Sequence, residues 1–218
     1  MIKRVKGELY IEGISLANIA KEFSTPCYVY SRKAIEENYL SYVEALDNQS
    51  HLVCYAVKSN SNIAVLQLLS SLGAGFDVVS IGELERVLIA GGDPKKVVFS
   101  GLAKTEEEMT RALAVGIHCF NVESQSELLL LNKTAKTMSL SAPISIRVNP
   151  DVDAKTHPYI STGLKEDKFG IDIDKAIEVY LRAAQMPNIN IIGVDCHIGS
   201  QITEIEPFRD AMMRLLSL

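Results

Sequence analysis

The sequence lacks the signatures of metal-binding, secreted and membrane proteins. Its four cysteines are widely scattered and form no CxxC pair or Cys/His cluster, which argues against a zinc site and a disulfide framework. The first residues, MIKRVKGELYIEG, contain no uninterrupted apolar stretch, so they fit neither a secretory signal nor a membrane span. We therefore expect a cytoplasmic protein with reduced thiols, no bound metal and no membrane partner.

An excess of positive charge is also missing. The chain has 22 Lys and Arg residues against 27 Asp and Glu residues, a formal net charge of −5. Nucleic-acid binding requires a basic patch or stripe, so nucleic acid is not an expected partner. What the sequence does have is 47% hydrophobic residues among 218, which is enough to bury a sizeable core.

From residue 52 onward, short β-branched runs alternate with amphipathic helical patterns at a spacing of about 20–25 residues. The predicted strands are residues 52–58, 75–80, 96–101, 118–123, 143–149 and 190–199. The segments between them have apolar residues at helical spacing, as crossover helices do. Ser124 with Glu127 and Thr105 with Glu108 fit capping boxes, which explains these polar residues without a function. The alternation predicts an α/β protein with a parallel sheet.

A closed (β/α)8 barrel of the TIM type needs about eight such units, and the sequence supplies about six. We therefore expect an incomplete barrel. The last helical segment, residues 204–218, ends without a glycine cap or a polar tail. From this we expect the chain to be the amino-terminal fragment of a longer protein.

Three segments stand outside the regular repeat. Residues 6–23 predict a strand and a short helix, and residues 25–46 predict a second strand and helix. Residues 149–170 form an irregular segment that is longer than the loops of most compact domains. Because this segment includes aromatic and apolar residues, we expect it to be functional.

The ends of the predicted strands carry most of the polar residues of interest. In barrels and open α/β sheets, reactive groups gather at the carboxyl ends of the strands, where the loops converge on one face. The residues at these ends are Lys58, Asp77, Ser80, Ser100, Asn121, Glu123, Arg147, Asn149, His197, Gly199 and Ser200. They predict a rim rich in cationic, hydroxyl and imidazole groups.

Lys58 and His197 each have two interpretations. A lysine after a strand can be a surface residue whose ammonium reaches water. Above a dry barrel mouth, desolvation favours the neutral amine, which attacks an aldehyde such as that of pyridoxal phosphate. His197 is either an ordinary hydrogen-bonded imidazole or a flat ring that stacks on an aromatic group. Gly199 and Ser200 supply an open backbone and a hydroxyl suited to a phosphate oxygen.

Four motifs occur in order along the chain: YAVKSN, FDVVSIGELERVLIAGGDPKKVVFSG, RVNPDVDAKTHPYISTGLKEDKFGI and GVDCHIGSQ. Together they resemble the diaminopimelate decarboxylase family of alanine-racemase-like (fold type III) pyridoxal-phosphate enzymes. The resemblance covers most of residues 26–210. It implies that residues 27–218 form part of a pyridoxal-phosphate-binding barrel, and that residues 1–26 associate with a carboxy-terminal β-domain that is absent here. It also implies a homodimer for the full-length protein.

The resemblance assigns roles to individual residues. Lys58 looks like the catalytic lysine that holds pyridoxal 5'-phosphate as a Schiff base, and His197 looks like the imidazole stacked on the cofactor ring. Ser200 matches a residue that approaches the phosphate.

Three further residues match rim positions of the family. Asp77 and Ser80 match positions near the cofactor and its lysine, and Arg147 matches the arginine beside the cofactor ring. The sequence departs from the family at Asp195, where many members have a histidine. It also lacks the family's glycine-rich phosphate loop, an EPGR-like stretch whose glutamate pairs with the pyridine nitrogen, and a Cys-Glu-Ser segment. Since that glutamate makes the ring a deep electron sink, we expect the chain alone to be inactive.

The implied activity of the full-length protein is decarboxylation of meso-diaminopimelate to L-lysine and carbon dioxide, the last step of lysine biosynthesis, with a small amino acid as substrate. Decarboxylases of ornithine, arginine or carboxynorspermidine share this chemistry and parts of these motifs, so they stay as alternatives. A single-domain pyridoxal-phosphate carrier is another interpretation. Its characteristic lysine context and its glycine- and serine-rich phosphate loop do not occur in the sequence.

Overall fold

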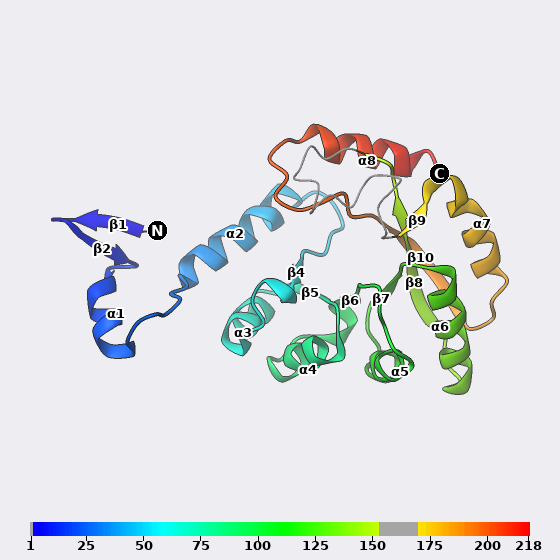
Figure 1. Cartoon of the computed structure of the whole chain (residues 1–218), viewed down its shortest axis with the longest axis horizontal. Helices are drawn as coiled ribbons and strands as arrows, with labels where there is room; N and C mark the ends of the chain where they lie inside the picture. Colours follow the sequence, from blue (N-terminus) through cyan, green and yellow to red (C-terminus); the bar gives the residue numbers. More distant parts are fainter. Residues whose placement is uncertain (1, 153–169) are drawn as a thin grey trace.

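The computed structural model describes residues 2–152 and 170–218. Its centre is a parallel sheet with the strand order β10-β8-β7-β6-β5-β4, and β9 pairs with β8 beside this path (Figure 1). The strands are β4 Cys54–Ala56, β5 Gly75–Val78, β6 Val97–Phe99, β7 Cys119–Val122, β8 Ala142–Asn149, β9 Ile171–Asp172 and β10 Ile189–Asp195. All the predicted strands from residue 52 onward are confirmed, with bounds that differ by a few residues.

The order of the strands in the sheet follows their order in the chain, and every neighbouring pair is parallel. A doubly wound sheet would reverse its order at a switch point, whereas sequential order is the arrangement of a (β/α)8 barrel. The sheet is therefore an arc of a barrel, as the sequence predicted.

Helices cover one face of this arc, which we call the outer face (Figure 1). They are α3 Ile63–Ser71, α4 Ile81–Ile89, α5 Glu106–Val115, α6 Gln125–Thr137 and α7 Ile173–Ala184, with the short 3-10 turns η1 Val57–Ser59 and η2 Pro94–Lys96 between elements. The outer face of the strands is apolar and fully buried at Phe76, Phe99, Phe120, Ile144 and Ile146. The rings of Phe99 and Phe120 stack with centroids 6.1 Å apart. This apolar layer holds the helices on the sheet.

Helices α2 (Arg32–Ala45) and α8 (Glu206–Leu216) lie toward the top of Figure 1, away from the outer row of helices. In α8, the Nη1 atom of Arg214 donates a 2.9 Å hydrogen bond to the carbonyl of Pro150, which follows β8. Val152, Ile198 and Ala211 form a small buried cluster there. The segments that follow β8 and β10 are thus joined to α8 beyond the carboxyl ends of the strands.

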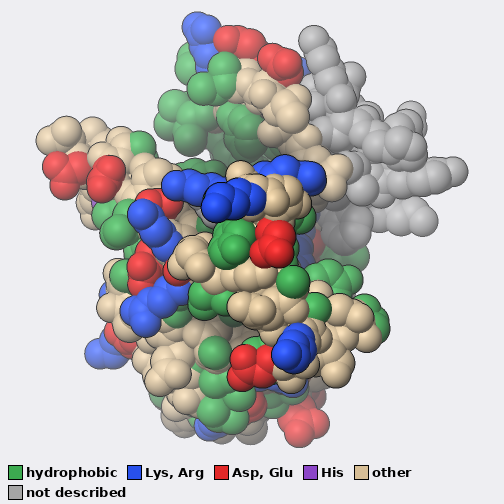
Figure 2. Space-filling model, turned by 90° about the vertical axis from the view of Figure 1, so that its left-hand side faces the viewer, with side chains coloured by type: hydrophobic (Ala, Val, Ile, Leu, Met, Phe, Trp, Pro, Cys, Tyr) green, Lys and Arg blue, Asp and Glu red, His purple; other side chains and the backbone are tan. Residues whose placement is uncertain are grey.

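The amino-terminal residues form a separate small sheet. Strands β1 (Ile2–Val5), β2 (Glu8–Ile11) and β3 (Ile14–Ser15) pair antiparallel and lead into α1 (Leu16–Phe23). The Glu12 carboxylate accepts hydrogen bonds from the Ser31 hydroxyl and, at 2.9 Å, from the Lys33 amide, which ties this sheet to the start of α2. Figure 2 shows this side of the molecule, where acidic, basic and hydrophobic side chains are interspersed.

Two expectations for these parts of the chain have other outcomes. The strand predicted at the start of residues 25–46 is wrong, because residues 24–31 are irregular and Tyr28 is 92% exposed. An apolar run forms a strand only beside a partner strand, and none lies beside this one among the described residues. The predicted functional segment 149–170 lies mostly outside the described residues.

Candidate functional site

The inner face of the sheet, opposite the helices, carries polar side chains in place of apolar ones. Asp77 lies between the outer-face residues Phe76 and Val78, and Asn121 lies between Phe120 and Val122, so strand alternation turns both polar side chains inward. Asn121 pairs in register with Ser145, which therefore shares this face. The inner face is built to hold hydrogen-bonding groups.

A chain of hydrogen bonds crosses this face through four strands or strand ends. The Ser145 hydroxyl donates to Asn121 Oδ1 at 2.6 Å, Asn121 Nδ2 donates to Ser100 Oγ at 3.0 Å, and Ser100 Oγ donates to Asp77 Oδ1 at 2.5 Å. Burial raises the pKa of Asp77, while the bond from Ser100 and the charge of Lys58 act in the opposite direction. Asp77 therefore has fixed neighbours on the side of β6 and a cationic neighbour in Lys58.

Nearer the carboxyl ends, Glu123 and Arg147 form a buried ion pair. Arg147 Nη1 lies 2.9 Å from Glu123 Oε1, and the Gly101 amide donates to the same oxygen at 2.8 Å. The other oxygen, Oε2, has no hydrogen-bond partner within the described part of the chain. Gly170 packs on Arg147, because a Cβ atom at this position would lie 3.0 Å from the Arg147 carbonyl oxygen and its φ is +81°. Only glycine fits this contact without strain.

A second buried ion pair joins Lys104 and Glu127. The sequence did not predict it. Lys104 Nζ is 2.8 Å from Glu127 Oε1, with side-chain exposures of 1% and 6%. The sequence predicted a capping box of Ser124 with Glu127. One of its two hydrogen bonds is present, since the Ser124 hydroxyl accepts from the Glu127 amide at 3.2 Å. The Glu127 carboxylate binds Lys104 and the Glu123 amide (3.1 Å to Oε2). The capping box of Thr105 with Glu108 is confirmed.

Lys58 and His197 each lie two residues beyond the end of a strand, β4 and β10. We use the word mouth for the carboxyl-end side of the inner face, where Asp77, Glu123 and Arg147 lie. Lys58 lies in η1, two residues beyond the end of β4, whereas the sequence placed it in the strand itself. His197 follows β10 and keeps contact with solvent, although partial burial lowers its pKa, and the charges of Arg147 and Lys58 lower it further. Lys58 follows Ala56, which pairs with Asp77 of β5, and His197 follows Asp195, which pairs with Arg147 of β8, so both residues come just after the carboxyl ends of strands whose inner face is polar.

The hydroxyls of Ser80 and Ser200 have different surroundings. Ser80 is the N-cap of α4, and its hydroxyl accepts from the Glu83 amide at 3.3 Å. Its position beside β5 matches the predicted rim, and its hydroxyl serves the helix start. Ser200 is exposed in the loop after β10. A contact of Ser200 with a phosphate stays a prediction.

Asp195, where the sequence departs from the resembled family, faces the inner side of the sheet. Its Cα pairs in register with Arg147 of β8. Burial raises the pKa of Asp195 to about 6, with Arg147 acting against the rise and Asp77 and Glu123 adding to it. The departure therefore places a buried carboxyl with a raised pKa among the candidate site residues.

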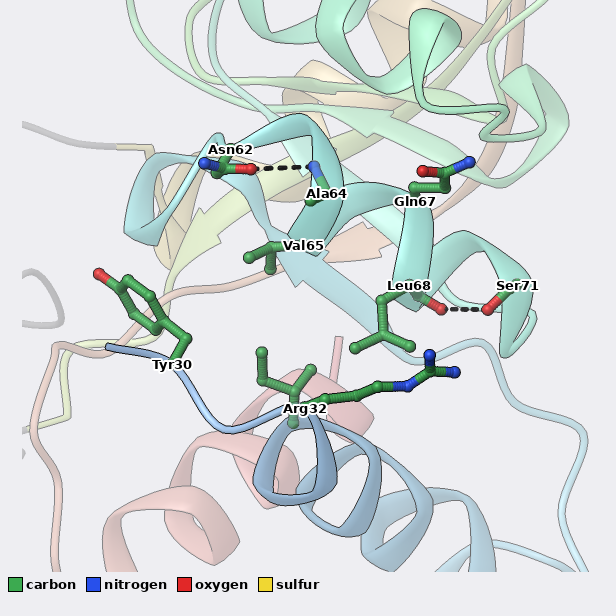
Figure 3. Close-up of a pocket in the computed structure, with 9 residues that line it drawn as sticks. Tyr30, Arg32, Asn62, Ala64, Val65, Gln67, Leu68 and Ser71 are labelled. Atoms are coloured by element: carbon green, nitrogen blue, oxygen red, sulfur yellow. Dashed lines mark hydrogen bonds between the residues drawn. The ribbon is translucent and has the colours of Figure 1, made fainter. Parts of the chain in front are cut away.

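A hollow of about 500 Å³ lies elsewhere, between the start of α2 and helix α3 (Figure 3). Its polar groups serve local structure: Asn62 Oδ1 accepts from the Ala64 amide at 2.9 Å, and Ser71 Oγ donates to the Leu68 carbonyl at 2.6 Å. The titratable groups of the mouth do not line it. We therefore place the chemistry at the inner face of the sheet.

Comparison with known proteins identifies the family. The family model for pyridoxal-dependent decarboxylases, pyridoxal binding domain, matches residues 32–218. The chain belongs to this family. Diaminopimelate decarboxylase from Pseudomonas aeruginosa is 63% identical over 97% of this chain and 51% of the relative. The chain thus spans about half the length of the curated relatives it matches.

Solved structures of decarboxylases have the same fold. The structure of diaminopimelate decarboxylase from M. jannaschii in co-complex with L-lysine superposes with a TM-score of 0.93 at 40% identity, over 100% of this chain and 52% of that one. Lysine decarboxylase from Selenomonas ruminantium gives a TM-score of 0.80 at 26% identity, over 95% of this chain and 51% of that one. The expected membership of the pyridoxal-phosphate decarboxylases and the expected partial barrel are confirmed.

The inner face of this pyridoxal-binding domain fits its cofactor. It combines an accessible amine at Lys58, an imidazole at His197 whose pKa is lowered by partial burial, and a buried Glu123 oxygen that has no hydrogen-bond partner within the described residues. Within residues 2–152 and 170–218, His, Cys, Asp and Glu side chains form no group of three or more that could hold a metal ion. No helix in these ranges is both long enough and apolar enough to span a membrane.

Proposed function

We propose that this chain carries the cofactor site of a decarboxylase that converts meso-diaminopimelate to L-lysine and carbon dioxide. The observation that supports this most directly is the position of Lys58, Asp77, Arg147 and His197 at or just after the carboxyl ends of β4, β5, β8 and β10 in a pyridoxal-binding domain. The names of the relatives, identical at up to 63%, support the choice of substrate. Because the chain covers about half of each relative, the activity is proposed for the whole protein.

Each residue has a physical task in this proposal. Bound pyridoxal phosphate supplies an electron sink for the electron pair of the bond to the departing carboxylate. Lys58 would hold the cofactor through its ε-amine. His197 would present its flat imidazole to the cofactor ring, and its lowered pKa favours the uncharged form of that imidazole. Ser200 donates to the phosphate.

Arg147 and Asp77 supply charged groups at the mouth, and Ser80 supports the backbone there. Arg147 is held by Glu123, and its guanidinium would stabilise negative charge on a cofactor bound at the inner face. Asp77 lies near the lysine that holds the cofactor, and its hydrogen bond from Ser100 fixes the orientation of the carboxylate. Ser80 starts α4 and keeps the backbone after β5 in place.

Trapping the cofactor on the chain tests the role of Lys58. After incubation with pyridoxal phosphate, borohydride reduction makes the link between aldehyde and amine permanent, and peptide mass spectrometry locates it. We expect the label on Lys58 and its loss in Lys58→Ala. Lys95→Ala, which removes an exposed lysine from η2, is the matched control and keeps the label. A label on another lysine in the wild-type chain would refute the assignment.

The substrate is tested separately, in the protein that carries this chain together with the half that its relatives have beyond it. The named lysine decarboxylase relative shows that the fold accepts another amino acid, at 26% identity. Carbon dioxide release is therefore compared for meso-diaminopimelate, lysine, ornithine, arginine and carboxynorspermidine. Fastest turnover of any amino acid other than meso-diaminopimelate would overturn the substrate while leaving the cofactor site intact.

Assembly and location belong to the same proposal. We infer that the whole protein is a cytoplasmic homodimer, in which residues 1–26 join the β-domain. The separate antiparallel sheet formed by β1, β2 and β3 supports the assignment of residues 1–26, and the four free cysteines agree with a reducing compartment. Sedimentation equilibrium that gives the mass of a monomer would exclude the homodimer.

A further inference from the structure

Lys104 is a buried lysine that the proposed chemistry does not use. Lysine is rarely buried unless its charge is paired and its donors are satisfied. Lys104 Nζ meets both conditions, because it donates to Gly101 O at 2.7 Å, to Asn121 O at 2.8 Å and to Glu127 Oε1 at 2.8 Å. It also lies 5.9 Å from the centroid of the Phe99 ring. A residue with so many fixed contacts determines where its partners lie.

The partners of Lys104 are the groups that hold Glu123. Gly101, whose carbonyl binds Lys104, uses its amide to donate to Glu123 Oε1 at 2.8 Å. Glu127, whose Oε1 binds Lys104, accepts from the Glu123 amide through Oε2 at 3.1 Å. Lys104 thereby fixes both the backbone and the carboxylate of Glu123.

The conformation of Gly101 makes this arrangement specific. Its φ of +102° lies in the region that favours glycine, and this turn presents its carbonyl to Lys104 and its amide to Glu123. Without the ammonium, the Gly101 carbonyl would lose its bond to Lys104, and the turn would lose the contact that orients its amide. Glu123 would then keep the guanidinium of Arg147 but lose its fixed position.

The balance of charges also indicates that the Glu123–Arg147 pair depends on Lys104. The cluster contains two cations, Lys104 and Arg147, and two carboxylates, Glu123 and Glu127, joined in pairs. All four side chains are 11% exposed or less. Loss of one cation would leave an unpaired carboxylate in a poorly hydrated region, which favours rearrangement of the remaining pair.

We propose that Lys104 is a positioning residue that, through Gly101, Glu127 and Glu123, holds the Arg147 guanidinium in place for the bound cofactor. The placement of Arg147 is a property of this chain by itself. Its consequence for the cofactor rests on the proposed function.

The competing explanation is that Lys104 only stabilises the fold by neutralising Glu127. A charge-balanced double variant separates the two, because Lys104→Met/Glu127→Gln removes both charges together. If Lys104 were only a stabiliser, this variant would behave as wild type at the mouth. If Lys104 positions Arg147, the variant still lacks the bonds to Gly101 and Asn121, and the mouth is altered.

Two measurements test this: one follows the mobility of the Arg147 guanidinium, and the other follows the affinity for pyridoxal phosphate. Nitrogen NMR of arginine-labelled chain, without cofactor, reports whether rotation of the Arg147 guanidinium is restricted by its ion pair. Absorbance titration then gives the dissociation constant for pyridoxal phosphate. We expect the double variant to lose the restricted Arg147 signal and to bind the cofactor about tenfold more weakly, the factor for one lost hydrogen bond to a charged group.

Lys133→Met/Glu106→Gln removes an exposed pair, 3.4 Å between Lys133 Nζ and Glu106 Oε1, that joins α5 to α6, and it leaves both readouts unchanged. An unchanged Arg147 signal in a folded Lys104 double variant overturns the inference. Failure of wild type to bind pyridoxal phosphate, with the Arg147 signal still lost in the variant, overturns the proposed function and supports the positioning role. If the double variant does not fold, Lys104→Arg, which keeps the charge but not the geometry, replaces it with the same expectations.

Discussion

The outer and inner faces of the same strands differ sharply in character. On the outer face, Phe76, Phe99 and Phe120 are fully buried against the helices. On the inner face, one residue away along the strands, Asp77 and Asn121 form hydrogen bonds across the sheet. Burial of apolar area stabilises a fold without regard to direction, whereas hydrogen bonds and ion pairs place groups at defined positions. The fold therefore depends mainly on one face and the chemistry on the other.

This division predicts that substitutions on the two faces have different consequences. The largest effect on stability is expected from Phe120→Ala on the outer face, because Phe120 is 0% exposed and stacks on Phe99. Loss of the ring leaves a cavity between the sheet and its helices, so the free energy of unfolding falls by about 3–5 kcal/mol. Urea denaturation followed by circular dichroism measures the change.

Phe120→Leu is the control for this prediction. It keeps most of the apolar volume and should lose clearly less stability than Phe120→Ala. If both variants were as stable as wild type, the outer face would not be the main source of stability, and the comparison between the faces would fail.

A smaller effect is expected from Asn121→Ala on the inner face. Asn121 accepts a hydrogen bond from Ser145 at 2.6 Å and donates one to Ser100 at 3.0 Å. Its removal therefore deprives each of these two hydroxyls of one hydrogen-bond partner. The cost of leaving such buried groups unsatisfied is about 1–3 kcal/mol in the free energy of unfolding. The same urea experiment measures it.

The double variant Asn121→Ala/Ser145→Ala sharpens this prediction. Since the two residues share one hydrogen bond, the destabilisation of the double variant should be less than the sum of the two single effects. Strictly additive effects would show that the hydrogen-bonded chain on the inner face is not coupled.

The outer face and the strand ends were predictable from the sequence for a definite reason. A strand buried under helices needs a run of β-branched and aromatic residues, as in VVF of β6, and such runs recur along the chain. Sequential βα units also require the carboxyl ends of the strands to converge, which brought Lys58, Asp77 and Arg147 into one predicted rim. The register of the strands agrees with this, since Ala56 of β4 pairs with Asp77 of β5 and Arg147 of β8 pairs with Asp195 of β10, while the roles of these residues stay predictions.

The inner support of the rim was not predictable in the same way. Lys104 precedes a helix and is followed by the capping residue Thr105, a pattern typical of an exposed helix start. Its partner Glu127 is 23 positions away, and no local pattern indicates that the two meet. The predicted strand near Tyr28 failed for a related reason, because a strand depends on a neighbour that the local sequence does not reveal.

The smallest expected effect tests the inner face by pH. The pKa of Asp195 is raised from 3.8 to about 6, chiefly by burial, so the folded state binds a proton more tightly than the unfolded state does. Above pH 6 the folded protein therefore carries an unfavourable charge. This penalty shrinks as the pH falls from about 6 towards 3.8, and it vanishes only well below 3.8, where both states are protonated. Asp195→Asn should raise the free energy of unfolding by about 1–2 kcal/mol at pH 8, which is a shift of about two pKa units reduced for partial exposure, and by clearly less at pH 4.

The groups that face Asp195 decide whether this sign holds. Arg147 on β8 and Lys104 favour the carboxylate, whereas Asp77 on β5 and Glu123 after β7 disfavour it, and burial adds to the second side. Urea denaturation of wild type and Asp195→Asn at both pH values measures the balance. A variant that is less stable than wild type at pH 8 would show that Arg147 outweighs burial, and Asp195 would then stabilise the inner face as an ion-pair partner of the guanidinium.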